Sequence, residues 1–178
     1  FIKKNNEFTV NIALTEKDTP GAGVIYGPVF RQMYLGEINT GAFKKDNVSD
    51  SDFSPGKTFE TFLQTSQKLP IINKHRPYTA VASRSHRSEE TREFLQKLEE
   101  EKGPTAIISK GSSLKICMVA EGKADIYPRF GPTMEWDTGA GHAIALASGA
   151  SVNKTDGTPL LYNKENLLNP YFIVKRNS

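Results

Sequence analysis

The sequence has 178 residues, which is enough for one domain with its own core or for two small halves. Hydrophobic residues make up 37% and charged residues 24%, as in an ordinary globular protein. The net charge of +3 is too small to indicate a nucleic-acid polymer as partner, and no apolar run approaches the roughly 20 residues that span a bilayer. No signal peptide is predicted at Phe1, and Cys117 is the single cysteine. We therefore expect a cytoplasmic protein without a transmembrane segment, at most peripheral to a membrane.

Residues 1–46 predict part of an antiparallel sheet. Apolar side chains alternate with small or polar ones over residues 8–14, which is the period of a strand with one apolar face. Three further strand-like runs follow at 22–29, 32–38 and 41–44. Their close spacing and short turns favour a meander of neighbouring antiparallel strands.

Residues 47–77 predict a loop and connector, and residues 78–178 predict an α/β half. The stretch 47–56 is rich in Ser, Asp and Asn and lacks periodicity, so we expect an exposed loop there. Strands alternating with helices follow, which favours a mixed sheet. Strands are expected at 79–83, 105–109, 124–127, 150–153 and 171–175, and helices at 88–103, from 112 or 113 to 122, and 136–149. The predicted fold class is thus α+β, a partial antiparallel sheet followed by a layered α/β half.

Positively charged residues follow or precede several of these strands. A doubly wound sheet gathers such strand ends at one edge, which would suit an anionic ligand, whereas a solvated charged surface is the alternative. The residues concerned are Lys74 to Arg76, Arg84 to Arg87, Lys110, Lys115 and Arg129.

The stretch Gly111-Ser-Ser-Leu-Lys115 joins a strand end to a helix start. Free backbone N–H groups at such a junction bind phosphate oxygens, and Lys115 is one turn into the helix. The spacing is not that of a Walker P-loop. An ordinary Ser N-cap beside a solvated lysine is an equally good interpretation of these residues alone.

Asp137 opens a helix of small residues, where either an N-cap or a first-turn acid belongs. A carboxylate there could also face a metal–phosphate complex. Arg129 could clamp a phosphate through its planar guanidinium, or pair structurally with Glu135 or Asp125. His86, at another strand end, could donate to a phosphate, a ribose or a base edge, or could simply lie on the surface.

Five stretches together resemble a known family. The sequence Trp-Asp-Thr-x-Ala-Gly-His-Ala is similar to the C-terminal signature of the magnesium-dependent, lithium-sensitive phosphatases of the inositol monophosphatase superfamily. Within it, the chain most resembles the 3′(2′),5′-bisphosphate nucleotidases of the CysQ type, over the C-terminal two-thirds of such a protein. The further matching stretches begin at Glu7, Ser83, Gly111 and Tyr127.

The resemblance implies a sugar-phosphatase-like fold and a Mg²⁺-dependent phosphatase that removes the 3′-phosphate of adenosine 3′,5′-bisphosphate, a by-product of sulfur assimilation. It implies that Asp137 is a metal ligand. It also implies that the substrate is held by His86, Gly111, Ser112, Lys115, Arg129 and Asp137. A substrate among the inositol or sugar phosphates of the same superfamily is the second alternative.

The superfamily's other metal ligands, a Glu and an Asp-Pro-x-Asp-Gly-Thr motif, match nothing in this chain. Asp156-Gly157-Thr158 repeats three letters of the motif but is predicted to be a turn. We therefore expect no catalytic residue in this chain and no turnover by the chain alone, which leaves a nucleotide-binding or partner-binding fragment as an alternative. We also expect self-association, or association with an N-terminal half that carries the motif.

Overall fold

The computed structural model describes residues 6–73, 75–82 and 88–177. The strands are β1 Val10–Glu16, β2 Thr19–Gly27, β3 Gln32–Glu37, β4 Gly41–Lys45, β5 Gln67–Leu69, β6 Thr79–Ala82, β7 Ala106–Ser109, β8 Ile126–Arg129, β9 Ala150–Lys154 and β10 Phe172–Arg176. The helices are the 3₁₀ turn η1 Asp50–Phe53, α1 Phe59–Gln64, α2 Glu89–Lys102, α3 Leu114–Glu121 and α4 Glu135–Ala147. No helix in this described part of the chain is long and apolar enough to span a bilayer.

The first sheet is a five-stranded antiparallel meander in the order β1-β2-β3-β4-β5. The predicted antiparallel meander is therefore confirmed. Buried residues alternate with partly exposed ones along β2, β3 and β4, so these strands have a buried face. Ile25, Tyr34 and Ala42 lie on the buried face, which packs against α4.

The second sheet is mixed, in the order β7-β6-β8-β10-β9. β6 pairs in parallel with β7 and β8, whereas β10 pairs antiparallel with β8 and β9. This confirms the predicted mixed sheet of the α/β half.

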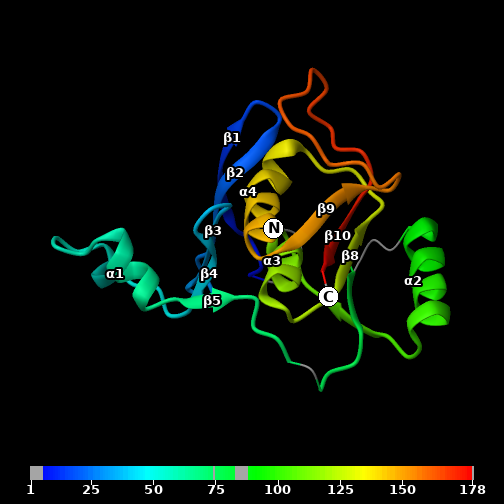
Figure 1. The fold of residues 1–178 in the computed structure, drawn as a ribbon, viewed down its shortest axis with the longest axis horizontal. Helices are drawn as coiled ribbons and strands as arrows, with labels where there is room; N and C mark the ends of the chain where they lie inside the picture. Colours follow the sequence, from blue (N-terminus) through cyan, green and yellow to red (C-terminus); the bar gives the residue numbers. More distant parts are fainter. Residues whose placement is uncertain (1–5, 74, 83–87, 178) are drawn as a thin grey trace.

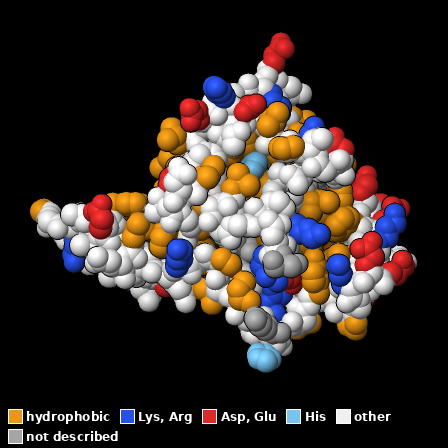
Figure 2. Space-filling model, viewed as in Figure 1, with side chains coloured by type: hydrophobic (Ala, Val, Ile, Leu, Met, Phe, Trp, Pro, Cys, Tyr) orange, Lys and Arg blue, Asp and Glu red, His pale blue; other side chains and the backbone are white. Residues whose placement is uncertain are grey.

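Helices α3 and α4 lie between the two sheets, and α2 lies on the far side of the second sheet (Figure 1). The four layers thus run from the first sheet through α3 and α4 to the second sheet and then α2. Figure 2 shows that acidic side chains gather over α2, so its outer surface is a solvated charged face.

Two glycines allow the close packing of the first sheet on α4. A Cβ at Gly23 would lie 2.3 Å from the carbonyl oxygen of Ala140, and one at Gly36 would lie 2.5 Å from the Cα of Ile144. Because any side chain would collide with helix backbone, these glycines let the sheet and the helix that begins at the candidate site approach closely.

The connector contains structure that the sequence analysis missed. The predicted loop at 47–56 contains η1, and α1 follows within an arm that projects from the body (Figure 1). β5 then adds a fifth strand to the predicted four by pairing with β4. These elements have three to six residues each, too short for a periodic pattern to show.

The outer face of the first sheet is apolar and open. The side chains of Val10, Ile12 and Leu14 are 50%, 65% and 68% exposed, although they alternate as a core-facing strand would. Cross-strand neighbours extend this face to Val24 and Leu35, which are half-buried. We call this surface, with Val10, Ile12, Leu14, Val24 and Leu35, the outer apolar face.

Candidate functional site

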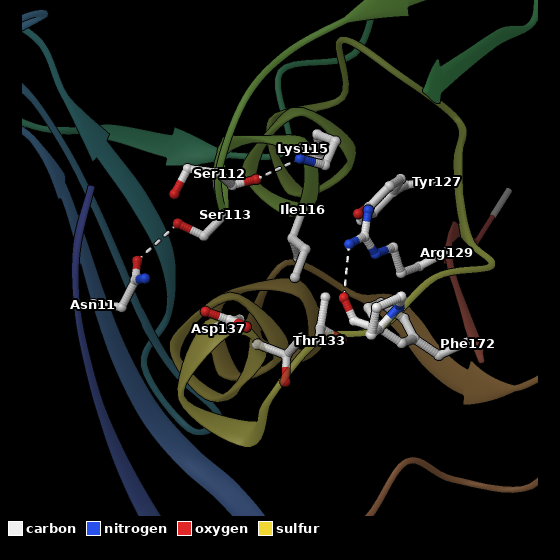
Figure 3. A pocket seen from close by; sticks show the side chains of 12 residues that line it. Asn11, Ser112, Ser113, Lys115, Ile116, Tyr127, Arg129, Thr133, Asp137 and Phe172 are labelled. Atoms are coloured by element: carbon white, nitrogen blue, oxygen red, sulfur yellow. Dashed lines mark hydrogen bonds between the residues drawn. The ribbon is translucent and has the colours of Figure 1, made fainter. Parts of the chain in front are cut away.

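A cavity of about 260 Å³ lies where the two halves of the chain meet, at the N-terminal ends of α3 and α4 (Figure 3). β1 contributes Asn11, the start of α3 contributes serines and a lysine, and the segment from β8 to α4 contributes the remaining polar groups. The lining residues are Asn11, Ser112, Ser113, Lys115, Ile116, Tyr127, Arg129, Pro132, Thr133, Asp137, Thr138 and Phe172. Four of the predicted site residues, Ser112, Lys115, Arg129 and Asp137, are thereby brought together.

The serine loop before α3 is not an ordinary N-cap. Ser113 occupies the N-cap position, but its hydroxyl makes no capping bond and instead donates to Asn11 Oδ1 at 2.7 Å. The hydroxyl of Thr9 lies 2.6 Å from that of Ser112 and 2.8 Å from that of Ser113. These bonds tie β1 to the loop and leave the first N–H groups of α3 without a side-chain cap, as an anion site requires.

Lys115 is buried, which contradicts the alternative of a solvated lysine. Its Nζ donates to the Ser112 carbonyl oxygen at 2.8 Å and lies 5.7 Å from the centre of the Tyr127 ring. Burial, followed by the nearby charge of Arg129, lowers the pKa of Lys115 to about 8. Within the described residues no carboxylate pairs with this ammonium group.

Arg129 does not make the structural ion pairs that the sequence left open. Asp125 is bound by Arg76 and Arg176 at 2.5 and 2.6 Å, and Glu135 is paired with Lys164. The Arg129 Nη2 donates only to the Pro132 carbonyl oxygen at 2.9 Å, and its buried Nε has no partner among the described residues. The guanidinium belongs to a residue of the cavity wall and has no carboxylate partner among the described residues, so an anionic ligand would supply its counter-charge.

Asp137 is a first-turn residue of α4 and not its N-cap, since the helix begins at Glu135 after Met134. Its Oδ2 accepts the backbone N–H of Met134 at 2.8 Å, whereas its Oδ1 accepts no hydrogen bond from the described residues. The carboxylate therefore stabilises the helix start with one oxygen and keeps the other for the cavity that it lines.

The described residues supply one carboxylate to this cavity and do not form a metal site by themselves. No group of three or more His, Cys, Asp or Glu side chains that could hold a metal occurs among them, and the remaining residues of the sequence include no Asp or Glu. Mg²⁺ requires several oxygen ligands in near-octahedral order. Asp137 can supply one such oxygen ligand, and the described lining of the cavity holds no second carboxylate.

The remaining predicted positions have different outcomes. His86 lies outside the described residues. Gly111 precedes Ser112 but is not part of the cavity lining. The expectation that all the positive residues gather at one sheet edge is wrong for Arg76, which precedes β6 and binds Asp125 just before β8. Arg76 therefore lies at the opposite ends of these parallel strands from Lys115 and Arg129.

Asn11, Ser113 and Thr133 line the cavity but were not predicted to bind a ligand. Asn11 belongs to β1 and reaches the cavity only because the first sheet packs beside α3 and α4. Thr133 lies between two predicted elements, in a loop with no periodic pattern. The signal available for Thr133 was a polar residue two positions before the acid that starts the helix, Glu135.

Comparisons with known proteins agree on the kind of protein this is. Residues 1–173 match the model of the inositol monophosphatase family. A 3′(2′),5′-bisphosphate nucleotidase CysQ of Salmonella typhimurium is 44% identical over 175 residues, and that of Escherichia coli K12 is 43% identical, each alignment covering 98% of this chain and 62% of the relative. The chain therefore spans less than two thirds of the length of these relatives.

Solved structures give the same result. The crystal structure of CysQ from Bacteroides thetaiotaomicron is 49% identical with a TM-score of 0.94, covering 100% of this chain and 66% of that one. Staphylococcal IMPase-II has a TM-score of 0.72 at 17% identity, covering 99% of this chain and 62% of that one, which shows a shared fold. The predicted sugar-phosphatase-like fold is confirmed.

Proposed function

The chain belongs to the inositol monophosphatase family, and on this premise we propose that it forms the substrate-binding part of a phosphatase that removes the 3′-phosphate of adenosine 3′,5′-bisphosphate. The observation that carries the proposal is the pair of cations, Lys115 and Arg129, that line one cavity without a carboxylate partner among the described residues. The nucleotidase relatives support the choice of substrate.

In this proposal Lys115 and Arg129 bind phosphate oxygens, the first as a point charge and the second through its planar fork. The uncapped start of α3, with Gly111 and Ser112, adds backbone and hydroxyl donors. His86, which the sequence predicts to lie at a strand end, is proposed to contact the nucleotide. These groups hold and orient the substrate and exclude water, and none of them is proposed as the nucleophile.

Asp137 is proposed as one Mg²⁺ ligand, with the other ligands provided by a polypeptide that carries further acidic residues. Bound Mg²⁺ would neutralise charge on the phosphoryl group that is transferred to water. In this proposal Asp137 places one carboxylate oxygen at the cavity. The hydrogen bond from the Met134 N–H to the other oxygen holds the carboxylate in position.

The main alternative is a fragment that binds a nucleotide or a partner without turnover. The single carboxylate at the cavity favours this alternative for the chain by itself. A second alternative within the same family is hydrolysis of inositol or sugar monophosphates, which the nucleotidase relatives make the weaker choice.

Release of inorganic phosphate from adenosine 3′,5′-bisphosphate tests the proposal. The chain alone should release none, and the chain combined with the N-terminal third of a CysQ relative should release phosphate only when Mg²⁺ is present. The product should be adenosine 5′-monophosphate, identified by phosphorus NMR. Faster release from inositol monophosphate would instead favour the sugar-phosphatase alternative.

We further propose that the outer apolar face is covered in the working protein, by a preceding polypeptide or by a second copy of the chain. Exposed apolar surface of this extent on one sheet face marks an interaction site. The exposed fractions of Ile12 and Leu14, 65% and 68%, support this proposal.

A further inference from the structure

Asn169 is a buried loop residue that fixes the segment between β8 and α4. Its backbone N–H donates to the Thr133 carbonyl oxygen at 2.8 Å, and residue 168 forms an isolated β-bridge with Met134. Its side-chain Nδ2 lies 2.9 Å from the Met134 carbonyl oxygen, 3.2 Å from Thr133 Oγ1 and 3.0 Å from Thr138 Oγ1. The side chain is 4% exposed, so these contacts are shielded from water.

The orientation of this amide is fixed by chemistry. The Met134 carbonyl oxygen can only accept a hydrogen bond, so the group facing it must be the Asn169 nitrogen and not its oxygen. The oxygen Oδ1 is left buried without a hydrogen-bond partner in the described part of the chain. Burying this oxygen without a partner costs free energy. The hydrogen bonds of the amide nitrogen therefore determine the orientation of the side chain.

The Asn169 amide has two N–H hydrogens for three neighbouring oxygens, so its longest contact, to Thr133 Oγ1, shares a hydrogen with another acceptor. An amide nitrogen donates and never accepts, so Thr133 Oγ1 is the acceptor in that contact. The single hydroxyl proton of Thr133 therefore points to another acceptor, and none occurs among the described residues. Thr138 differs, since its hydroxyl already donates to the Glu135 carbonyl oxygen at 3.2 Å. Thr133 lines the cavity beside Asp137 (Figure 3), so its proton is available to whatever occupies the cavity.

We propose that Thr133 is a further ligand-contacting residue that donates to an anionic phosphate oxygen, and that Asn169 is the positioning residue that makes it a donor. This inference rests on the proposed function, because it assumes that the cavity between Lys115 and Asp137 takes a phosphate group. It adds a contact on the wall formed by the loop before α4, in addition to the contacts of the serine loop, Lys115 and Arg129.

The first test replaces the hydroxyl while keeping the side-chain shape. Thr133→Val should weaken the affinity of the full chain for adenosine 3′,5′-bisphosphate about tenfold, since a hydrogen bond to a charged group is lost. Thr133→Ser keeps the hydroxyl and should stay within about threefold of the parent affinity. Calorimetry gives the affinities, and thermal unfolding checks that both variants fold. Equal affinity of Thr133→Val and the parent would overturn the proposal.

A double-mutant cycle tests the role of Asn169. Asn169→Leu removes the donor and should weaken binding in the parent but have little further effect in Thr133→Val, because Asn169 acts through the Thr133 hydroxyl. A merely structural Asn169 would weaken binding equally in both backgrounds, which would contradict its positioning role. If Asn169→Leu does not fold, the comparison of Val with Ser at position 133 still decides whether Thr133 contacts the ligand.

A second probe separates this inference from the proposed function. If the parent binds inorganic phosphate but not the nucleotide, the substrate assignment fails, whereas a loss of phosphate binding in Thr133→Val would still support the contact. If the nucleotide binds and Thr133→Val has no effect with either probe, the inference fails and the proposed function stands. Absence of binding for both probes would overturn both.

Discussion

Lys115 and Arg129 line the same cavity as two positive charges, and neither forms an ion pair within the described part of the chain. Arg129 contributes, after burial, to the lowered pKa of Lys115. Lys115 is buried and Arg129 is half-buried, so two like charges with no counter-ion among the described residues disfavour each other, and a bound anion would relieve that cost. This relationship is the main physical argument that the cavity takes a phosphate ester.

The pH dependence of anion binding should report Lys115. Binding of inorganic phosphate should weaken as the pH rises above about 8, because free Lys115 loses its proton there. A bound anion raises the pKa of the ammonium group, so its contribution is complete below the free-state pKa and disappears above the bound-state pKa. Calorimetry from about pH 7 to about pH 10 covers this range. Lys115→Met is the control, and an unchanged pH profile in that variant would assign the dependence to another group.

Substitutions at Asp137 separate its helix contact from its proposed metal contact. Asp137→Asn keeps an oxygen that can accept the Met134 N–H, so thermal stability should change little. Asp137→Ala removes that acceptor and should cost about 1 kcal/mol of unfolding free energy. In the chain combined with the N-terminal third of a CysQ relative, both variants should lose Mg²⁺-dependent phosphate release. Activity retained by Asp137→Asn would leave Asp137 with a structural role alone.

Two glycines in β2 provide a matched test of the packing between the first sheet and α4. Gly23→Ala should destabilise the protein by about 3 kcal/mol or more, since its Cβ would lie 2.3 Å from the Ala140 carbonyl oxygen. Gly21→Ala should be neutral or slightly stabilising, because the nearest atom to its Cβ would be 4.0 Å away. Urea unfolding of both variants gives the comparison. Similar stabilities for the two would show that sheet and helix separate easily.

Association through the outer apolar face is testable by sedimentation. The chain should self-associate through this face, because Ile12 and Leu14 are 65% and 68% exposed. The double substitution Ile12→Ser with Leu14→Thr should shift the chain toward the monomer. Ile38→Ser is a control, as Ile38 is 48% exposed but lies beyond the end of β3. A chain that is already a sharply unfolding monomer would contradict the proposal that this face is covered.

The sequence predicted the features that depend on local pattern. Alternation identified β1, and strand-like runs between short turns identified β2 to β4. The Gly111 to Lys115 junction identified one wall of the cavity, the wall that is proposed to bind an anion. The sequence could not predict which distant charges pair. Asp125 takes Arg76 and Arg176, which lie 49 and 51 residues away, and this leaves Arg129 for the cavity. Asn169 was equally hidden, because its role depends on a loop that folds against the start of α4.

The most direct test of the central claim is a calorimetric comparison of two ligands with the parent chain and Lys115→Ala. Adenosine 3′,5′-bisphosphate should bind more tightly than adenosine 5′-monophosphate, since it offers a second phosphate to the two cations. Lys115→Ala should weaken the bisphosphate by about tenfold or more and the monophosphate by less, because a desolvated charge-assisted contact is worth roughly 1.5–3 kcal/mol. An equal loss for both ligands, or no loss for either, would contradict the claim that this cavity recognises a nucleotide bisphosphate.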